Sequence, residues 1–96
     1  MNTSDSELAA QAAGGDMAAF QVLLERHYDS IFRIALRFTG VREDAEDVAQ
    51  TVCTSLAVKL RSFKGEARFT TWLYRIVVNA SQDFHRRQSA TTRLHQ

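Results

Sequence analysis

A chain of 96 residues has room for one domain, and its 45% of hydrophobic residues excludes a disordered chain while allowing a modest core. The single cysteine, Cys53, excludes an internal disulfide, and no apolar run approaches the length of a membrane span. We therefore expect a cytoplasmic domain without membrane insertion. The net charge of +1 is unevenly distributed along the chain. Residues 1–60 contain five basic and nine acidic side chains, whereas residues 61–96 contain seven basic and two acidic ones.

The chain has no proline, and its four glycines divide it into four pieces with helical periodicity. Ser4 and Glu7 have the spacing of a capping box, which predicts a short helix that ends before Gly14. Asp16 is the expected N-cap of a longer helix that stops at Gly40. The apolar side of this second helix is expected to contain Phe20, Leu23, Leu24, His27, Tyr28, Ile31, Ala35 and Phe38.

A third helix is expected from about Glu43 to Arg61, and a fourth from about Arg68 to Arg87. Residues 89–96 show no period and are expected to form a frayed tail or the start of a linker. No segment alternates with period two, so the sequence predicts an all-α bundle of three long helices and one short N-terminal helix. The expected inward residues are Ala45, Val48, Ala49, Val52, Leu56 and Leu60 on the third helix, and Phe69, Trp72, Leu73, Ile76, Val77, Ala80 and Phe84 on the fourth.

The third helix has a polar side opposite its apolar stripe. Glu43, Asp47, Gln50 and Thr54 lie almost directly across the helical wheel from the apolar residues, and Thr51 flanks them. A solvated surface with acidic residues in the first turn is one interpretation, since acids there complement the helix dipole. A surface that docks on a basic partner protein is the other. Composition alone does not choose between them.

The fourth helix carries a continuous polar stripe of Arg75, Asn79, Gln82 and Arg86, at spacings of four, three and four residues. Arginine, asparagine and glutamine are the residue types that read base edges in DNA, so the stripe is a candidate DNA contact. The same residue types also favour an ordinary exposed helix surface. Trp72 borders the stripe and is expected either to pack in the core or to contact DNA.

The segment SFKGEAR, residues 62–68, separates the last two helices. Gly65 permits backbone conformations that other residues resist, and Lys64, Glu66 and Arg68 supply polar groups. The segment is either a plain connection or a pocket for a base removed from the stack, whose Watson–Crick edge requires donors and acceptors.

Spacings typical of an enzyme are missing from the sequence. We find no Ser/His/Asp, Cys/His or metal-ligand arrangement and no glycine motif that cradles phosphate, so we expect neither catalysis nor a cofactor nor a metal. Cys53 is expected to be a small core residue, since no second cysteine or suitably spaced histidine pair accompanies it.

Several motifs together resemble region 2 of the extracytoplasmic-function sigma factors of bacterial RNA polymerase. These are DMAAFQVLLERHYDSIFRIALRFTG (residues 16–40), DAEDVAQ (44–50), SFKGEARFTTWLYRIVVN (62–79) and the pair Arg86-Arg87. The resemblance covers residues 16–88, preceded by a short helix and cap in 1–15. It implies a domain that docks on core RNA polymerase and that recognises and helps to melt the −10 promoter element.

The resemblance also implies a binding partner for each of the two polar surfaces. The helix with DAEDVAQ docks on the clamp helices of the largest polymerase subunit in this family, which implicates Asp44, Asp47, Gln50, Thr51 and Thr54. The loop of the SFKGEAR type receives a flipped base of single-stranded −10 DNA, and the following helix contacts the same element. The DNA-binding residues implied in this way are Lys64, Gly65, Glu66, Ala67, Arg68, Trp72, Arg75, Asn79, Gln82, Arg86 and Arg87.

Two departures from the family pattern concern the third helix. Family members usually follow DAEDVAQ with an acidic, an apolar and an aromatic residue, where this chain has Thr51, Val52 and Cys53. A common tryptophan is replaced by Ala57. We expect looser packing there, unless it is compensated, and altered polymerase docking.

A third departure is length, because residues 89–96 stand where family members begin the linker to a second DNA-binding domain, region 4. We expect the chain to be a domain cut from a longer protein. An alternative function is a helical module bound mainly by an anti-sigma regulator, with little DNA affinity of its own. A repressor domain that binds duplex DNA is a further alternative, which the acidic side of the third helix disfavours.

Overall fold

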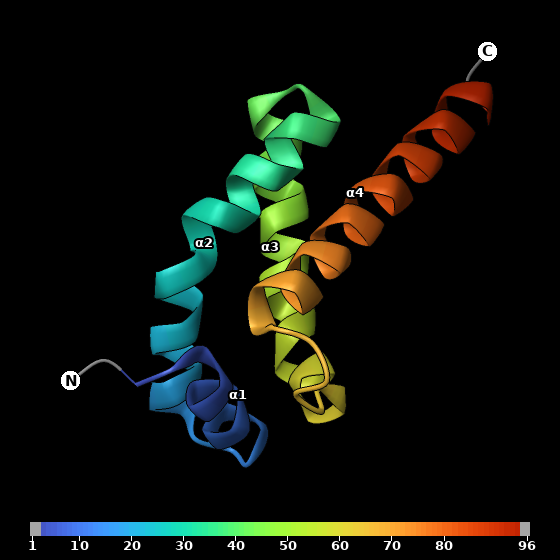
Figure 1. Cartoon of the computed structure of the whole chain (residues 1–96). Helices are drawn as coiled ribbons and strands as arrows, with labels where there is room; N and C mark the ends of the chain where they lie inside the picture. Colours follow the sequence, from blue (N-terminus) through green and yellow to red (C-terminus); the bar gives the residue numbers. More distant parts are fainter. Residues whose placement is uncertain (1–2, 95–96) are drawn as a thin grey trace.

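The computed structural model describes residues 3–94, and every regular element among them is helical. Figure 1 shows the arrangement, in which α2 and α3 run side by side and α4 crosses them. The predicted all-α fold with three long helices and one short helix is confirmed. The elements are α1 (Asp5–Ala13), α2 (Met17–Thr39), α3 (Arg42–Lys59), the 3₁₀ turn η1 (Leu60–Ser62) and α4 (Phe69–Leu94).

The predicted helix boundaries follow from local capping. The Ser4 hydroxyl accepts a hydrogen bond from the backbone N–H of Glu7 at 3.2 Å, which confirms the cap of α1. Asp16 caps α2 by accepting from the N–H of Ala19 at 3.0 Å. Gly40 ends α2 with a φ of 71°, a left-handed conformation that favours glycine.

The core lies where α2, α3 and α4 meet, and α1 covers the lower end of α2 in Figure 1. All six predicted inward residues of the third helix are buried. On α4, the predicted residues Trp72, Ala80 and Phe84 are only partly buried, while the other four are buried. The fully or nearly fully buried apolar residues are Leu8, Ala9, Ala19, Leu23, Ile31, Ala35, Ala45, Val48, Ala49, Val52, Leu56, Leu60, Phe69, Leu73, Ile76 and Val77.

The predicted inward side of α2 was wrong at two positions. Tyr28 and Phe38 are exposed, because Tyr28 lies about 100° around the helix from the buried His27 and Phe38 lies in the last turn. Ala57, which stands where a tryptophan is common, is also exposed. The side chain missing there would have lain on the surface, so the replacement leaves no hole in the core.

The predicted end of the fourth helix was also wrong, because α4 continues through Leu94 instead of ending near Arg87. No glycine or proline follows Arg87, so nothing local stops the helix, and Ser89 and Ala90 are helical and exposed. This last part of α4 extends away from the other helices (Figure 1). Gln96, the end of the expected tail, lies outside the described residues.

A long-range hydrogen bond joins α4 to the end of α2. His85 Nε2 lies 2.7 Å from the backbone oxygen of Phe38, one of the terminal carbonyls that have no partner within α2. The contact joins two residues that are 47 positions apart in the sequence. Within the residues that the structure describes, no helix combines the length and apolar character that crossing a membrane requires.

Candidate functional site

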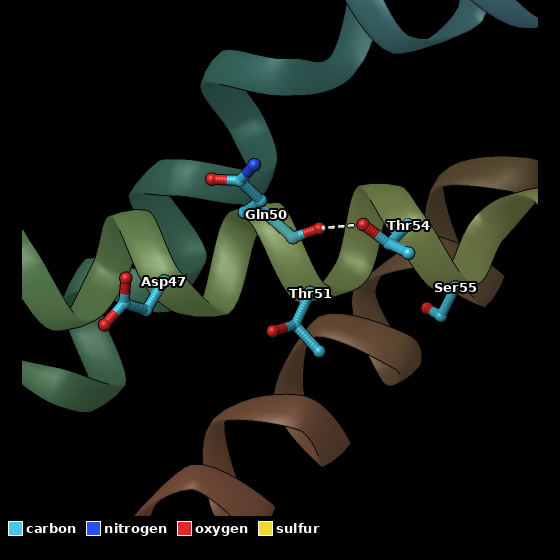
Figure 2. Close-up of a pocket in the computed structure, with 5 residues that line it drawn as sticks. All are labelled: Asp47, Gln50, Thr51, Thr54 and Ser55. Carbon is cyan, nitrogen blue, oxygen red and sulfur yellow. Dashed lines mark hydrogen bonds between the residues drawn. The ribbon is translucent and has the colours of Figure 1, made fainter.

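An open hollow of about 550 Å³ lies on the exposed side of α3. Figure 2 shows that the side chains around it come from three successive turns of the helix, and that the Thr54 hydroxyl donates to the backbone oxygen of Gln50 at 2.9 Å. Four of the five residues predicted to bind polymerase are therefore together on one surface. The residues that line the hollow are Asp47, Gln50, Thr51, Thr54 and Ser55.

Asp44, the fifth predicted polymerase-binding residue, does not line this hollow. It is half-buried in the first turn of α3 beside Glu43, where both carboxylates complement the helix dipole. The N-cap of α3 is Val41, whose side chain cannot accept a hydrogen bond, so acids in the first turn are the available stabilisation. Glu46 instead forms an ion pair with Arg42, in which Glu46 Oε1 lies 3.4 Å from Arg42 Nε.

A narrow groove of about 130 Å³ lies between α3 and α4. Asn79 lines it from α4, opposite Thr51, Ser55 and Lys59 on α3. Figure 2 shows Thr51 and Ser55 on the side of α3 where α4 lies. The floor and rim residues of this groove are Val48, Thr51, Ser55, Lys59, Asn79, Ala80, Asp83, Phe84 and Arg87.

The polar stripe of α4 is exposed as predicted, but its members differ in surroundings. Arg75, Asn79, Gln82 and Arg86 are all exposed. Arg86 forms an ion pair with Asp83 one turn earlier, so its charge is partly balanced. The stripe therefore contains the cation of Arg75, the amide of Asn79 beside the groove, and the Arg86–Asp83 ion pair nearer the C-terminal end.

The loop between η1 and α4 places its polar groups in solvent. Lys64, Glu66 and Arg68 are exposed, while Ala67 is half-buried. Gly65 has a φ of 76°, which a residue with a Cβ adopts only with strain. The loop thus combines a glycine-dependent turn with two exposed cations and one exposed carboxylate.

Aromatic side chains pack together at the two ends of this loop. Phe63, the first residue of the loop, and Phe69, directly after it, meet edge to face with ring centroids 5.7 Å apart. Trp72 packs on both, at 4.9 Å from Phe63 and 5.7 Å from Phe69. The half-buried tryptophan is therefore a packing residue directly beneath the candidate DNA-binding loop.

Sequence reasoning missed several residues of these surfaces. Ser55 and Lys59 follow Thr51 at intervals of four, and this helical spacing was the signal that could have found them. Asp83 and Phe84 complete the groove from α4. Cys53 is half-buried against the core, and burial raises the pKa of its thiol.

Comparisons with known proteins match the part of the chain that carries the hollow, the groove and the loop. The sequence model of the family "Sigma-70 region 2" matches residues 23–91. The ECF RNA polymerase sigma factor SigM of Mycobacterium tuberculosis is 40% identical over 87 residues, which is 91% of this chain and 44% of SigM. The chain thus spans less than half the length of this relative.

Two solved structures are similar in fold. One is the complex of an engineered region 2 of sigmaE with GTAAAA, with a TM-score of 0.84 and 30% identity over 93% of this chain and 95% of that one. The other is CnrH in complex with the cytosolic domain of CnrY, with a TM-score of 0.76 and 33% identity over 97% of this chain and 61% of CnrH. The chain therefore belongs to the sigma-70 region 2 family, as a region 2 domain of an extracytoplasmic-function sigma factor.

Proposed function

We propose that this transcription initiation domain docks on core RNA polymerase through the hollow on α3, and that α4 and the loop at residues 63–68 bind and help to melt the −10 promoter element. The observation that carries the proposal is the position of Asn79. Asn79 lines a groove between α3 and α4 that shares Thr51 and Ser55 with the hollow on α3.

The DNA side of the proposal rests on the groups available along α4 and the loop. Lys64, Arg68 and Arg75 are exposed cations suited to phosphates, and Asn79 supplies both a donor and an acceptor suited to a base edge. Single-stranded DNA is the ligand that fits these groups, because its unstacked bases can enter the narrow groove between α3 and α4. The sigmaE region 2 complex with GTAAAA supports the same choice.

The loop is proposed to receive a base removed from the stack. Gly65 turns the backbone, and Lys64 and Glu66 place a cation and a carboxylate in solvent on either side of it. A base held there loses stacking and pairing worth a few kcal/mol, which hydrogen bonds to its Watson–Crick edge must offset. Capture of that base would hold the melted strand apart from its partner.

The polymerase side rests on the hollow on α3. Asp47 supplies a carboxylate at one end of it, and Gln50 and Thr54 supply neutral hydrogen-bonding groups. Family members usually have an acidic residue where this chain has Thr51, so the proposed docking surface of this chain is less acidic. We propose the clamp helices of the largest polymerase subunit as the partner, with basic side chains facing Asp47.

A second candidate function is capture by an anti-sigma regulator, with DNA binding only in the context of the polymerase. The structure of CnrH with the cytosolic domain of CnrY favours this candidate. The two functions differ in what the isolated domain does with DNA, and that difference decides between them.

The deciding experiment is selection from a pool of single-stranded DNA with six randomised positions between constant flanks. We expect the retained strands to show a base preference at several positions, with single changes costing about 1–3 kcal/mol each. The affinity should fall with salt at a slope of about −0.7 per phosphate contacted. Failure of the isolated domain to retain any strands from the pool, while it still binds core polymerase, would support the anti-sigma candidate instead.

A further inference from the structure

An ion-pair cluster joins α1 to α2 at residues that are far apart in the sequence. Asp5 Oδ1 lies 2.9 Å from His27 Nε2 and 3.0 Å from Arg26 Nη1. The same Arg26 nitrogen donates to the backbone oxygen of Thr3 at 2.8 Å. His27 is buried, with 9% of its surface exposed. One carboxylate at the start of α1 therefore fixes both a surface arginine and a buried histidine of α2.

The other contact of His27 is with the aromatic cluster beneath the loop. Its ring centroid lies 5.1 Å from that of Phe69, the first residue of α4. Phe69 in turn contacts Phe63 and Trp72. A continuous series of side-chain contacts thus runs from Asp5 through His27 to both ends of the loop.

The backbone of α1 reinforces this connection. The helix packs against α2, α3 and the 3₁₀ turn η1, from which the loop departs. Its Leu8 and Ala9 are buried in the core, as is Leu60 in η1. Removal of the Asp5 carboxylate is therefore expected to loosen the attachment of α1 to α2 while the apolar contacts keep the helix in place.

We propose that Asp5 is a positioning residue for the DNA-binding loop, acting through the ring orientation of His27 and the packing of Phe69. The loop's role in DNA binding belongs to the proposed function, and the inference rests on it. Asp5 and all of α1 precede residues 23–91, the part matched by the family model. The N-terminal helix is thus assigned a share in promoter recognition without contacting DNA.

The geometry explains why a carboxylate is needed at this position. The Nε2–H of His27 donates to Asp5, which sets the rotation of the imidazole ring and hence the 47° angle between its plane and that of Phe69. An amide at position 5 still offers an oxygen acceptor, but without the charge that strengthens hydrogen bonds to arginine and histidine. The neutral variant should therefore keep the fold and weaken the hold on the ring.

The test compares Asp5→Asn with Glu7→Gln, in the full 96-residue chain. Both substitutions remove one negative charge from α1, but the Glu7 carboxylate receives its hydrogen bond from Ser4 within the same cap. Trp72 is the only tryptophan, so its fluorescence reports on the aromatic cluster directly. The other readouts are amide hydrogen exchange in residues 63–69, helix content, and selection from the randomised single-stranded pool.

We expect Asp5→Asn to shift the Trp72 emission, to speed exchange in the loop and to weaken binding of the selected strand about three- to tenfold, with helix content kept. Glu7→Gln should change none of these. Unchanged emission and loop exchange in Asp5→Asn would overturn the inference, as would a general loss of thermal stability with the base preferences and loop exchange intact. If the unmodified domain shows no base preference, the proposed function fails, while the emission and exchange data still decide whether Asp5 positions the loop.

Discussion

Thr51 on α3 and Asn79 on α4 line the same groove, although the family pattern assigns one to the polymerase and the other to DNA. Thr51 also lines the hollow that contains Asp47 and Gln50. The two candidate surfaces therefore share two residues, Thr51 and Ser55. Thr51 is neutral at a position where family members usually have an acid, so position 51 adds no carboxylate to the groove, and the carboxylate that lines it comes from Asp83 on α4.

Reversing the charge of Asp47 should abolish or strongly weaken association with core polymerase. The side chain lies in the hollow and is exposed, so Asp47→Lys removes a docking carboxylate without disturbing the core. Glu46→Lys is the matched control, because the adjacent Glu46 is also exposed but pairs with Arg42 outside the hollow. Co-purification with core polymerase is the measurement. Equal retention of both variants would show that the hollow is not the docking surface.

Asn79→Ala should reduce base preference, and Arg75→Ala should reduce affinity more evenly across sequences. Asn79 lines the groove, where we expect its side chain to contact a base edge, and its truncation should cost about 1–3 kcal/mol. Arg75 is exposed outside the groove residues, where phosphate contact is expected and the salt slope should fall.

Gln88→Ala controls for this experiment, since Gln88 is exposed on α4 about 180° around the helix from Asn79. Binding of the selected single strand and its one-base variants is measured at fixed salt. A uniform loss on every sequence with Asn79→Ala would assign that residue to phosphate contact and contradict base reading.

Gly65→Ala should impair DNA binding, whereas Gly40→Ala should not. Both glycines have a positive φ, of 76° and 71°, and an added Cβ would meet nothing within 4 Å at either, so each substitution costs backbone strain of about 1–2 kcal/mol. The losses of thermal stability should therefore be similar. Only the first change lies in the loop. If the two variants bind the selected strand equally well, the loop is a plain connection.

The ion pair of Asp5 should make stability depend on acidic pH. Burial by itself would raise the pKa of this carboxyl, but the hydrogen bonds from His27 and Arg26, with their charges, outweigh it and lower the pKa below the ordinary 3.8. A lowered pKa in the folded state stabilises the fold above 3.8, and this stabilisation is lost as the pH falls through the folded-state value.

Asp5→Asn should therefore lower the free energy of unfolding by about 1 kcal/mol at neutral pH, a modest value because the side chain is partly exposed. The difference from the unmodified chain should shrink as the pH drops below 3.8. Urea unfolding at a series of pH values measures it. A difference that stays constant down to pH 2 would contradict the assignment of the shift to Asp5.

Helix boundaries were predictable from the sequence because they depend on residues close together in the chain. Ser4 with Glu7 and Asp16 with Ala19 form caps within one turn, and the left-handed conformation at Gly40 requires only that residue to lack a side chain. The end of α4 was not predictable in the same way, because no local signal stops the helix after Arg87. Its continuation through Leu94 shows that the absence of period does not end a helix made of helix-tolerant residues.

The same distinction between local and tertiary causes applies to the candidate surfaces. The sequence by itself determined the all-α class, the polar side of α3 and the stripe on α4, because helical periodicity places residues three and four apart on one face. Only the tertiary structure decided that Asn79 faces Thr51 across a groove and that Asp5 reaches His27, 22 residues away. Both contacts depend on how helices cross and dock, and those angles are set by side chains from different helices filling one core rather than by the spacing within any of them.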